Sequence, residues 1–335
     1  MSKKRFPLFL LGVTAVIWTL TRYGERWLRL LFIYLSQAQW ARELVSSLPI
    51  TQQVASRFVA GETMDDAIEV AQALTVKRMH VTMDLLGEHV SNADEAIAAR
   101  GEITRLLDRI AANGLPDTNI SVKLSQLGLH ISEELVLENM RVLLTHAQKL
   151  GNKIRIDMEE SAVTDKTLRI FRTLHREYAN VGIVIQAYLR RSEADVRQLI
   201  DEGAWVRLCK GAYAEPPEVA FPDKADTDAN YVRLTEMMLS ENAREKGVYL
   251  GIATHDDQMV EAALAYAQEH AIDPQAFEFQ MLYGIRRELQ ESLIARGYQV
   301  RVYVPYGTAW YPYFVRRLAE RPANLWFFVS NLLRK

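Results

Sequence analysis

Cysteine is nearly absent from this sequence, whose 335 residues include a single one, Cys209. One cysteine excludes an intramolecular disulfide and any metal cluster that needs several thiolates. Cys209 lies in an apolar, strand-like run, so we expect a core side chain rather than a reactive thiol. This composition fits a reducing compartment, and we expect a cytoplasmic protein.

An excess of charge of one sign is also missing. The chain has 40 basic and 42 acidic residues, a formal net charge of -2 and a pI of about 6.4. Basic and acidic residues are interspersed, so no electrostatic footprint for nucleic acid is present and we expect no nucleic-acid partner. The hydrophobic fraction of 49% is ample for a large core, in one large domain or two ordinary ones.

Several binding motifs are missing as well. No G-x-G-x-x-G stands between a strand and a helix, and no G-x-x-x-x-G-K-[ST] occurs, so a Rossmann or P-loop nucleotide site has no support. No His-x-His follows the first predicted strand, and His255 has no second histidine at ligand spacing. We therefore expect no metal site.

The N-terminal apolar run is short for a membrane span. Lys3, Lys4 and Arg5 precede an apolar run from Phe6 to Leu20, whereas a spanning helix needs roughly twenty apolar residues. Three interpretations stay open: a helix at the membrane interface, a helix packed on the domain, and a signal peptide or span. We predict an N-terminal helical segment over 1–79, of which 1–35 is the candidate for peripheral membrane contact.

From residue 80 onward, short β-branched runs alternate with longer helical patterns. Strands are predicted at His80–Leu85, Ile120–Leu124, Ile154–Met158, Gly182–Ala187, Trp205–Cys209, Tyr249–Ala253, Phe277–Met281 and Val300–Val304. Helices are predicted at Met64–Met79 with Thr63 as N-cap, Ala93–Asn113, Ser132–Leu150, Thr164–Tyr178, Glu193–Glu202, Asp228–Lys246, Asp256–His270 and Arg286–Arg296. The alternation predicts an α/β fold, a (β/α)8 TIM-like barrel over 80–335, with a doubly wound sheet as the alternative.

A parallel barrel gathers its chemistry at the C-terminal ends of its strands. The polar residues at those ends are Asp84, Gly87-Glu88-His89, Lys123, Asp157, Gln186, Arg207, Lys210, Gly211, Tyr213, Thr254-His255-Asp256, Gln280 and Tyr303. A site rich in Lys, Arg, Gln and glycine suits a large anionic cofactor beside a small anionic substrate.

Structural interpretations of the same residues stay open. Asp84 and Asp157 can be buried partners of Lys123 or Arg207. His255 can cap the following helix together with Asp256, Lys210 can be a solvated turn residue, and Tyr303 and Tyr313 can be packing aromatics.

Near the C-terminus, an arginine pair follows the last predicted strand. Pro305 and Gly307 are expected to end that strand, and a helix follows. Tyr313, Arg316, Arg317 and Glu320 then fall at i, i+3, i+4 and i+7, on one face. Two adjacent guanidiniums suit a planar anion, and a solvated pair near the helix C-terminus is the alternative.

Ten segments in order resemble the proline dehydrogenase family, specifically its monofunctional bacterial members. They are F-V-A-G-E-T, M-D-L-L-G-E, S-V-K-L-S, D-M-E-E, Q-A-Y-L-R-R, R-L-C-K-G-A-Y-A-E-P, E-V-A-F-P-D-K, A-T-H, F-E-F-Q-M-L-Y-G and V-P-Y-G-T-A-W-Y-P-Y-F-V-R-R-L-A-E, over residues 58–320. The resemblance implies a distorted barrel, its last helix over the mouth, that binds FAD non-covalently. It also implies oxidation of L-proline to Δ1-pyrroline-5-carboxylate, with electrons passing to a quinone. Because a quinone dissolves in the bilayer, the N-terminal segment suggests peripheral contact with the inner face of the cell membrane.

The resemblance also implies residue roles. It places Lys123, Arg316 and Arg317 at the proline carboxylate, and Tyr303, Tyr313, Tyr213 and Leu282 around the ring. Asp157 and Arg207 would order the reacting centre, with Arg207 donating toward flavin N5. The other implied cofactor contacts are Ile156, Gln186, Lys210, Gly211, Ala212, Thr254, His255, Lys224 and Glu320.

Some positions depart from the family pattern. Ala214 stands where bifunctional relatives carry tryptophan, and Tyr306 replaces a small aliphatic residue and is expected to narrow the mouth. A separate pyrroline-5-carboxylate dehydrogenase is implied as a partner. Two other functions stay open: a flavoenzyme for another imino acid such as hydroxyproline, and a non-catalytic barrel that binds flavin or proline.

Overall fold

The computed structural model describes residues 55–87 and 89–320, with the side chains of the last helix described as far as Val315. Val59–Thr308 forms one compact unit, the barrel unit. Residues 55–58 and 309–320 are the described part of a second unit. Of the predicted N-terminal helical segment over 1–79, residues 1–54, which include the candidate membrane contact over 1–35, lie outside the described residues. The predicted domain boundary between 79 and 80 stays a prediction.

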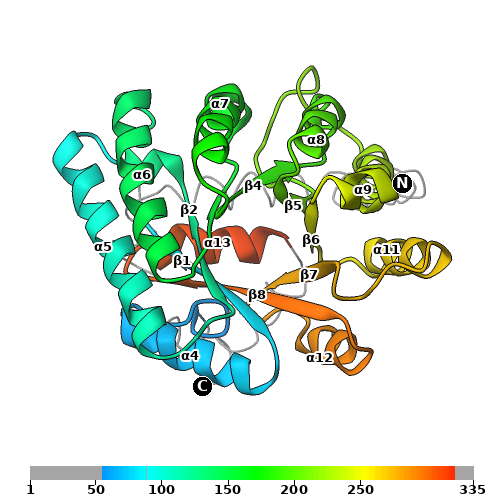
Figure 1. Cartoon of the computed structure of the whole chain (residues 1–335), viewed down its shortest axis with the longest axis horizontal. Helices are drawn as coiled ribbons and strands as arrows, with labels where there is room; N and C mark the ends of the chain where they lie inside the picture. Colours follow the sequence, from blue (N-terminus) through cyan, green and yellow to red (C-terminus); the bar gives the residue numbers. More distant parts are fainter. Residues whose placement is uncertain (1–54, 88, 321–335) are drawn as a thin grey trace, which may run out of the picture. The chain divides into compact units, whose positions relative to one another are not determined.

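The strands of the barrel unit close into a parallel barrel in chain order, β1 to β8 (Figure 1). They are β1 (His80–Leu85), β2 (Thr118–Val122), β3 (Ile154–Ile156), β4 (Val181–Gln186), β5 (Trp205–Cys209), β6 (Tyr249–Ala253), β7 (Phe277–Leu282) and β8 (Gln299–Tyr306). Each predicted strand is present. The predicted (β/α)8 barrel is confirmed, and the doubly wound alternative is wrong.

Helices surround the barrel in chain order (Figure 1). They are α4 (Met64–Val76), α5 (Ala93–Ala112), α6 (Glu133–Lys149), α7 (Ser161–Glu177), α8 (Ser192–Asp201), α9 (Lys224–Leu239), α10 (Glu241–Glu245), α11 (Asp257–Glu269) and α12 (Arg287–Ala295), with a 3₁₀ turn η1 (Leu124–Leu127). The predicted helix Asp228–Lys246 is two helices, because Ser240 adopts an extended conformation and its hydroxyl accepts from the Ala243 N–H at the start of α10. No described helix is long and apolar enough to cross a bilayer.

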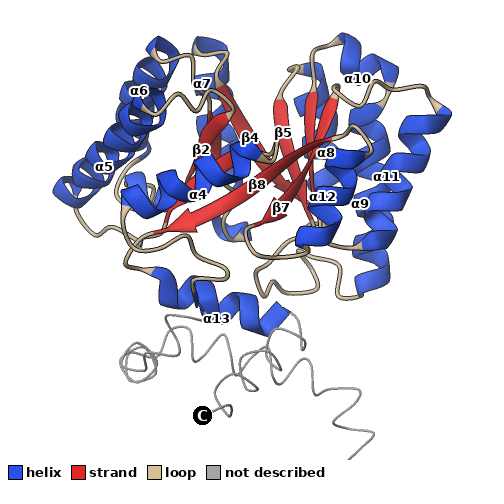
Figure 2. Ribbon diagram, turned by 90° about the horizontal axis from the view of Figure 1, so that it is seen from below, coloured by secondary structure: helices blue, strands red, loops and turns tan. Residues whose placement is uncertain are grey.

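Helix α4 takes the place in the ring between α12 and α5, where it packs on β8 and β1 (Figures 1 and 2). Thr63 caps it as predicted: its side chain accepts from the Asp66 N–H, and Asp66 accepts from the Thr63 N–H. The helix ends at Val76, before the predicted Met79, because Arg78 adopts a left-handed conformation with φ of 61°. The last described helix is α13 (Trp310–Glu320), as predicted. Its predicted place over the barrel mouth stays a prediction.

The two faces of the sheet differ sharply in composition. Side chains that face the helices are apolar and buried, for example Met83, Ile154, Ile156, Leu208 and Phe279. The alternate positions face the barrel interior, where bulky apolar residues usually dominate. Here they are largely polar: Thr82, Asp84, Asn119, Ser121, Lys123, Arg155, Asp157, Gln186, Arg207, Glu278, Gln280, Arg301 and Tyr303. The interior of this barrel is therefore held by hydrogen bonds and ion pairs.

Strand β8 is longer than predicted. The expectation that Pro305 ends the strand is wrong, because Pro305 pairs with Asp84 and Tyr306 pairs with Leu85 on β1. Proline has no N–H to donate to a neighbouring strand. The last β7 partner of β8 is Leu282, opposite Tyr303, so β7 has ended before Pro305, whose carbonyl accepts from the Ala60 N–H instead. Tyr306 packs in the hydrophobic core, so the expectation that it narrows the mouth is also wrong.

Candidate active site

The centre of the site is a carboxylate bound from two sides. Asp157 follows β3, and its Oδ1 accepts from Arg207 Nη1 on β5 at 2.8 Å. Its Oδ2 accepts from the Tyr303 hydroxyl on β8 at 2.7 Å. The Arg207 guanidinium also lies 4.9 Å from the centroid of the Tyr303 ring. Burial, followed by the charge of Asp157, raises the pKa of Tyr303 well above its usual value, so the hydroxyl keeps its proton.

Lys123 joins the same centre through a second carboxylate. Its Nζ donates to both oxygens of Asp84, at 2.7 and 2.8 Å, and lies 3.9 Å from Asp157 Oδ2. Burial disfavours the ammonium, but Asp84 and then Asp157 outweigh burial and raise the pKa of Lys123. The prediction that Asp84 and Asp157 pair with Lys123 and Arg207 is therefore confirmed. The strand ends bring these residues together.

Arg207 is held by Gln280, a predicted strand-end residue, which in turn contacts Glu278, a residue that the sequence analysis did not single out. Its Nε donates to Gln280 Oε1, and Gln280 Nε2 donates to Glu278 Oε1 at 2.5 Å. Nη1 of Arg207 also donates to Ser121 Oγ at 3.2 Å. The signal for Glu278 and Gln280 was the F-E-F-Q segment, where polar residues alternate with buried phenylalanines.

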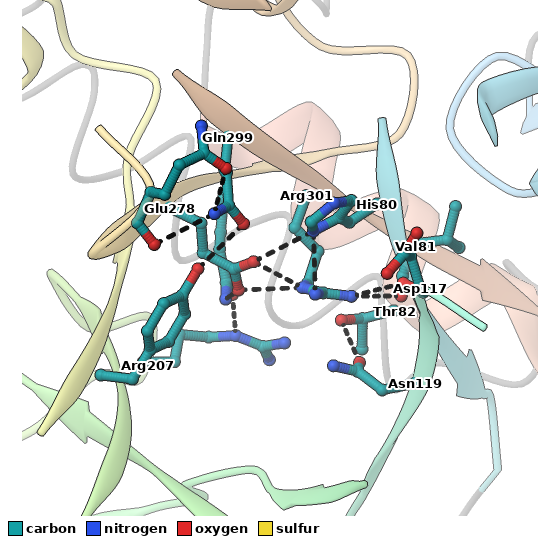
Figure 3. A network of polar contacts seen from close by, with 12 residues as sticks. His80, Val81, Thr82, Asp117, Asn119, Arg207, Glu278, Gln299 and Arg301 are labelled. Atoms are coloured by element: carbon teal, nitrogen blue, oxygen red, sulfur yellow. Dashed lines mark hydrogen bonds and ion pairs between the residues drawn. The ribbon is translucent and has the colours of Figure 1, made fainter. Parts of the chain in front are cut away.

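Glu278 in turn forms a buried pair with Arg301 (Figure 3). Arg301 Nε lies 2.8 and 3.0 Å from the two carboxylate oxygens, and its Nη1 donates to the carbonyls of Val81 and Asp117. Burial disfavours the Glu278 carboxylate, but Arg301, His80 and Arg155 together outweigh burial and lower the pKa of Glu278. A continuous polar network thus runs through the barrel from Arg301 to Asp157.

Two further glutamates fix the segments that follow β3 and β5. Glu159, in the D-M-E-E motif, accepts from the N–H and hydroxyl of Ser125 at 3.0 and 2.5 Å. Glu215, in A-Y-A-E-P, accepts from the N–H of Ser161 at 2.7 Å and from its hydroxyl at 2.5 Å. Both glutamates lie in motifs that the sequence analysis quoted, but the sequence did not predict Ser125 and Ser161 as their partners.

At the ends of β5 and β6, two lysines and two aspartates alternate in a ring. Lys210 and Lys224 both contact Asp228 and Asp256, with Lys210 and Lys224 Nζ lying 2.7 and 3.3 Å from Asp256 Oδ2. Burial disfavours the Asp256 carboxylate, but Lys210, Lys224 and the Gln258 N–H together outweigh burial, and the pKa of Asp256 falls to about 2. The interpretation of Lys210 as a solvated turn residue is wrong.

His255 does not act as the helix cap. Asp256 alone caps α11, through the Gln258 N–H at 3.1 Å. His255 Nε2 accepts instead from the Leu282 N–H at 2.9 Å, which joins the ends of β6 and β7. Thr254 is buried beside it, and its hydroxyl accepts from the Asp256 N–H.

The remaining predicted residues occupy different surroundings. Gln186 is buried at the end of β4, and its Oε1 has no hydrogen-bond partner among the described residues. Gly211 has φ of 120°, and a Cβ there would lie 2.2 Å from the Tyr188 ring, so the backbone requires glycine. Ala212 and Tyr213 follow on an exposed loop, and Ile156 has its side chain in the hydrophobic core. The side chains of Arg316, Arg317 and Glu320 lie outside the described part, and Tyr313 belongs to the second unit.

The family model described as proline dehydrogenase matches residues 67–329, most of the chain. This chain belongs to the proline dehydrogenase family. It is 40% identical to proline dehydrogenase 1 of Bacillus subtilis subsp. natto over 308 residues, which cover 92% of this chain and 100% of the relative. It is 42% identical to proline dehydrogenase of Deinococcus radiodurans over 286 residues, covering 84% and 90%.

Solved structures agree with this membership. Proline utilization A from Bdellovibrio bacteriovorus, in a crystal structure inactivated by N-propargylglycine, superposes with a TM-score of 0.78 at 27% identity. The superposition covers 91% of this chain but 38% of that one. The resemblance to the proline dehydrogenase family is therefore confirmed over the barrel.

Proposed function

We propose that this protein oxidises L-proline to Δ1-pyrroline-5-carboxylate with non-covalently bound FAD, the first step of proline catabolism. The observation that carries the proposal is the Asp157 carboxylate held between Arg207 and Tyr303, beside the Lys123–Asp84 pair, at one end of a family barrel. Ion pairs gathered at the C-terminal ends of barrel strands are typical of an active site in this fold.

The residues present fit a flavin. A flavin ring needs hydrogen bonds around its nitrogens, and Gln186 Oε1 and Arg207 Nη2 are buried polar atoms without a partner among the described residues. A bound flavin supplies the hydride acceptor. Arg207 would donate toward N5, while Thr254, His255, Gly211 and Ala212 would line the ring and ribityl chain. Ile156 would contribute only its main chain, since its side chain lies in the core.

The phosphates of the cofactor would lie near the lysine ring. Lys210 and Lys224 are cations beside the N-termini of α9 and α11, a setting that favours anions. Glu320 would reach the distal half. Asp228 and Asp256 already neutralise both lysines, so phosphate binding must compete with these carboxylates.

The proline carboxylate would be held by Lys123, Arg316 and Arg317. Lys123 has three N–H donors, and Asp84 accepts from it through both oxygens, which leaves a donor for the substrate. Because Lys123 and Arg207 are each paired with an aspartate, the field of their charges is largely cancelled. The arginine pair would therefore supply most of the attraction for the carboxylate. Tyr303, Tyr313, Tyr213 and Leu282 would contact the ring.

The chemistry requires a neutral substrate amine. A protonated nitrogen cannot donate its lone pair to the forming C=N bond, so the site must lower the amine pKa, and nearby cations do this. Fixing the carboxylate also orients C5 toward the hydride acceptor. Arg207 would stabilise the negative charge that develops there, in a position fixed by Asp157 and Gln280.

Anaerobic reduction tests the proposal. Purified protein should be yellow, and L-proline should bleach the flavin absorbance without oxygen. A colourless protein, or a yellow one that proline leaves unchanged, would refute it. Faster bleaching by hydroxyproline than by proline would identify the imino-acid alternative.

The electrons would pass to a quinone, and a separate pyrroline-5-carboxylate dehydrogenase would consume the product. Because a quinone dissolves in the bilayer, residues 1–35 would bring the enzyme to the inner face of the cell membrane, where Lys3, Lys4 and Arg5 favour anionic lipid. Full-length protein should cosediment with anionic vesicles, and a variant lacking residues 1–35 should not. Equal partitioning of the two would rule out this role.

A further inference from the structure

Arg155 on β3 presents a charge inside the barrel that the described side chains do not compensate. The residue has no exposed surface, and none of its three guanidinium nitrogens has a hydrogen-bond partner among the described residues. Arginine keeps its proton in proteins. An uncompensated buried charge destabilises a fold by several kcal/mol. The guanidinium therefore needs a partner of another kind.

An aromatic ring covers one face of this guanidinium. The Trp205 ring centroid lies 3.7 Å from Arg155 Cζ, and the indole reaches that position across Gly182, where a Cβ would lie 2.3 Å from it. A cation–π contact stabilises the charge from the face. The five N–H groups lie in the guanidinium plane and point to its edge, so the ring leaves them unsatisfied.

The other arginines and lysines inside the barrel each pair with a carboxylate. Lys123 pairs with Asp84, Arg207 pairs with Asp157, and Arg301 pairs with Glu278 (Figure 3 shows the last pair). Arg155 has no such carboxylate among the described residues. Burial, and then repulsion from Arg207, holds the pKa of Arg155 well below its usual value. Glu278 and Asp157 attract it, and Arg301 repels it.

We propose that Arg155 binds a small monovalent anion, of which chloride is the simplest, inside the barrel. An anion in the guanidinium plane accepts the unsatisfied N–H groups and also compensates the charge of Arg155. Water accepts the same N–H groups but leaves the buried charge of Arg155 without a counterion. Arg155 is not one of the residues proposed to hold flavin or proline, and the anion proposal does not depend on the proposed activity.

Bromide in crystals of the wild-type protein tests the site directly. Bromide replaces chloride in most anion sites and is identified by its anomalous scattering. A bromide peak within hydrogen-bond reach of the Arg155 guanidinium is expected. Ordered water there without a bromide peak would overturn the proposal, and it would do so whether or not any variant folds.

Stability in solution gives a second test. With ionic strength held constant, chloride replaces gluconate, which is too large to enter the barrel, so that screening of exposed charges does not change. The unfolding constant of the wild type should fall about tenfold for each tenfold rise in chloride above its Kd. Equal stability of the wild type in chloride and in gluconate would overturn the proposal.

Two variants locate the effect. Arg155→Met keeps an apolar chain against Trp205 and should lose the chloride response. Without chloride it should be at least as stable as the wild type, because an uncompensated charge has been removed. Lys153→Met is the matched control, since Lys153 lies over the same ring at 5.6 Å but is exposed, and it should keep the response. An unchanged response in Arg155→Met would overturn the assignment.

Discussion

The hydroxyl of Tyr303 donates to Asp157 Oδ2 at 2.7 Å across the barrel, from the last strand to the end of the third. The other oxygen of this carboxylate accepts from Arg207. Tyr303 was expected to be a wall beside the substrate ring. The Tyr303 hydroxyl also orients Asp157, which in turn orients Arg207. The hydroxyl and the ring of Tyr303 therefore have roles that can be tested separately.

Tyr303→Phe should separate those roles. The variant keeps the ring beside Arg207 and removes one hydrogen bond, which should cost about 1 kcal/mol of unfolding free energy. We expect kcat/KM for proline to fall by about tenfold, the effect of roughly 1.4 kcal/mol in the transition state.

Tyr249→Phe is the matched control, since the Tyr249 hydroxyl lies 3.1 Å from Gln299 Oε1 at the start of β6 and β8. It should show a comparable loss in urea denaturation with unchanged kcat/KM. Equal kinetic effects in the two variants would contradict a specific role for the Tyr303 hydroxyl.

Asp84 and Lys123 should behave as a coupled pair. Lys123→Met leaves a buried carboxylate uncompensated, and Asp84→Asn leaves an ammonium with one partner fewer. We expect each to cost about 3 kcal/mol, and the double variant to cost clearly less than the sum. Urea denaturation of the four proteins measures the coupling. Strictly additive costs would show that the pair contributes nothing beyond its separate members.

The same variants should act oppositely on substrate affinity. Lys123→Met should raise KM for proline, whereas Asp84→Asn should lower it by freeing the ammonium for the carboxylate. A rise in KM for both would mean that Asp84 positions Lys123 rather than competing with the substrate.

Arg316→Met should raise KM for proline by about tenfold or more with a smaller change in kcat, because it removes uniform binding of the carboxylate. Arg317→Met is the parallel variant. Competition by a carboxylate analogue of proline should weaken in step with KM. An unchanged KM in both variants would make the carboxylate assignment wrong.

Asp228→Asn should tighten FAD binding. Asp228 holds both Lys210 and Lys224, so its removal frees cations for the phosphates. We expect the Kd of the apoprotein for FAD, measured by flavin fluorescence, to fall severalfold at low salt, and the gain to shrink at high salt. Lys210→Met should raise that Kd. Weaker binding in Asp228→Asn would show that the aspartate orders the lysines for the cofactor.

Acid should destabilise the protein partly through Asp256. The pKa of its carboxyl is about 2 in the folded state, below its ordinary 3.8. Its ionised form therefore stabilises the fold above about pH 4, by about 2 kcal/mol, and this contribution is lost as pH falls toward 2. Asp256→Asn should lose that stability at pH 7 and show a shallower decline in acid.

Urea denaturation at pH 7, 4 and 3 measures this. Asp94→Asn, in the first turn of α5, is the control carboxylate at a helix N-terminus and should change the acid slope little. An identical slope in Asp256→Asn and the wild type would assign the acid sensitivity to other groups, among which buried Glu278 is the next to test.

Local pattern predicted the elements well, and partners across the fold poorly. Alternation placed every strand, and Thr63 identified the start of α4. The prediction that Pro305 ends β8 is wrong because a proline ends a strand only where a neighbouring strand needs its N–H, and that depends on how far the neighbour extends. Lys123 and Asp84 are 39 positions apart, so their pairing depends on barrel closure. Arg155, Glu278 and Arg301 stand out in the sequence as charged residues within apolar strand segments. The sequence does not show which of them remains unpaired.

The shortest strand of the barrel carries one interior charge and leads into another. β3 pairs with each neighbour over three residues, whereas β8 pairs with β1 over six, and β3 presents Arg155 and leads into Asp157. Few backbone hydrogen bonds hold this wall, so its local unfolding free energy depends on ion pairs between side chains. The rates of amide hydrogen exchange along 154–157 should therefore change when the ion pair between Asp157 and Arg207 is broken.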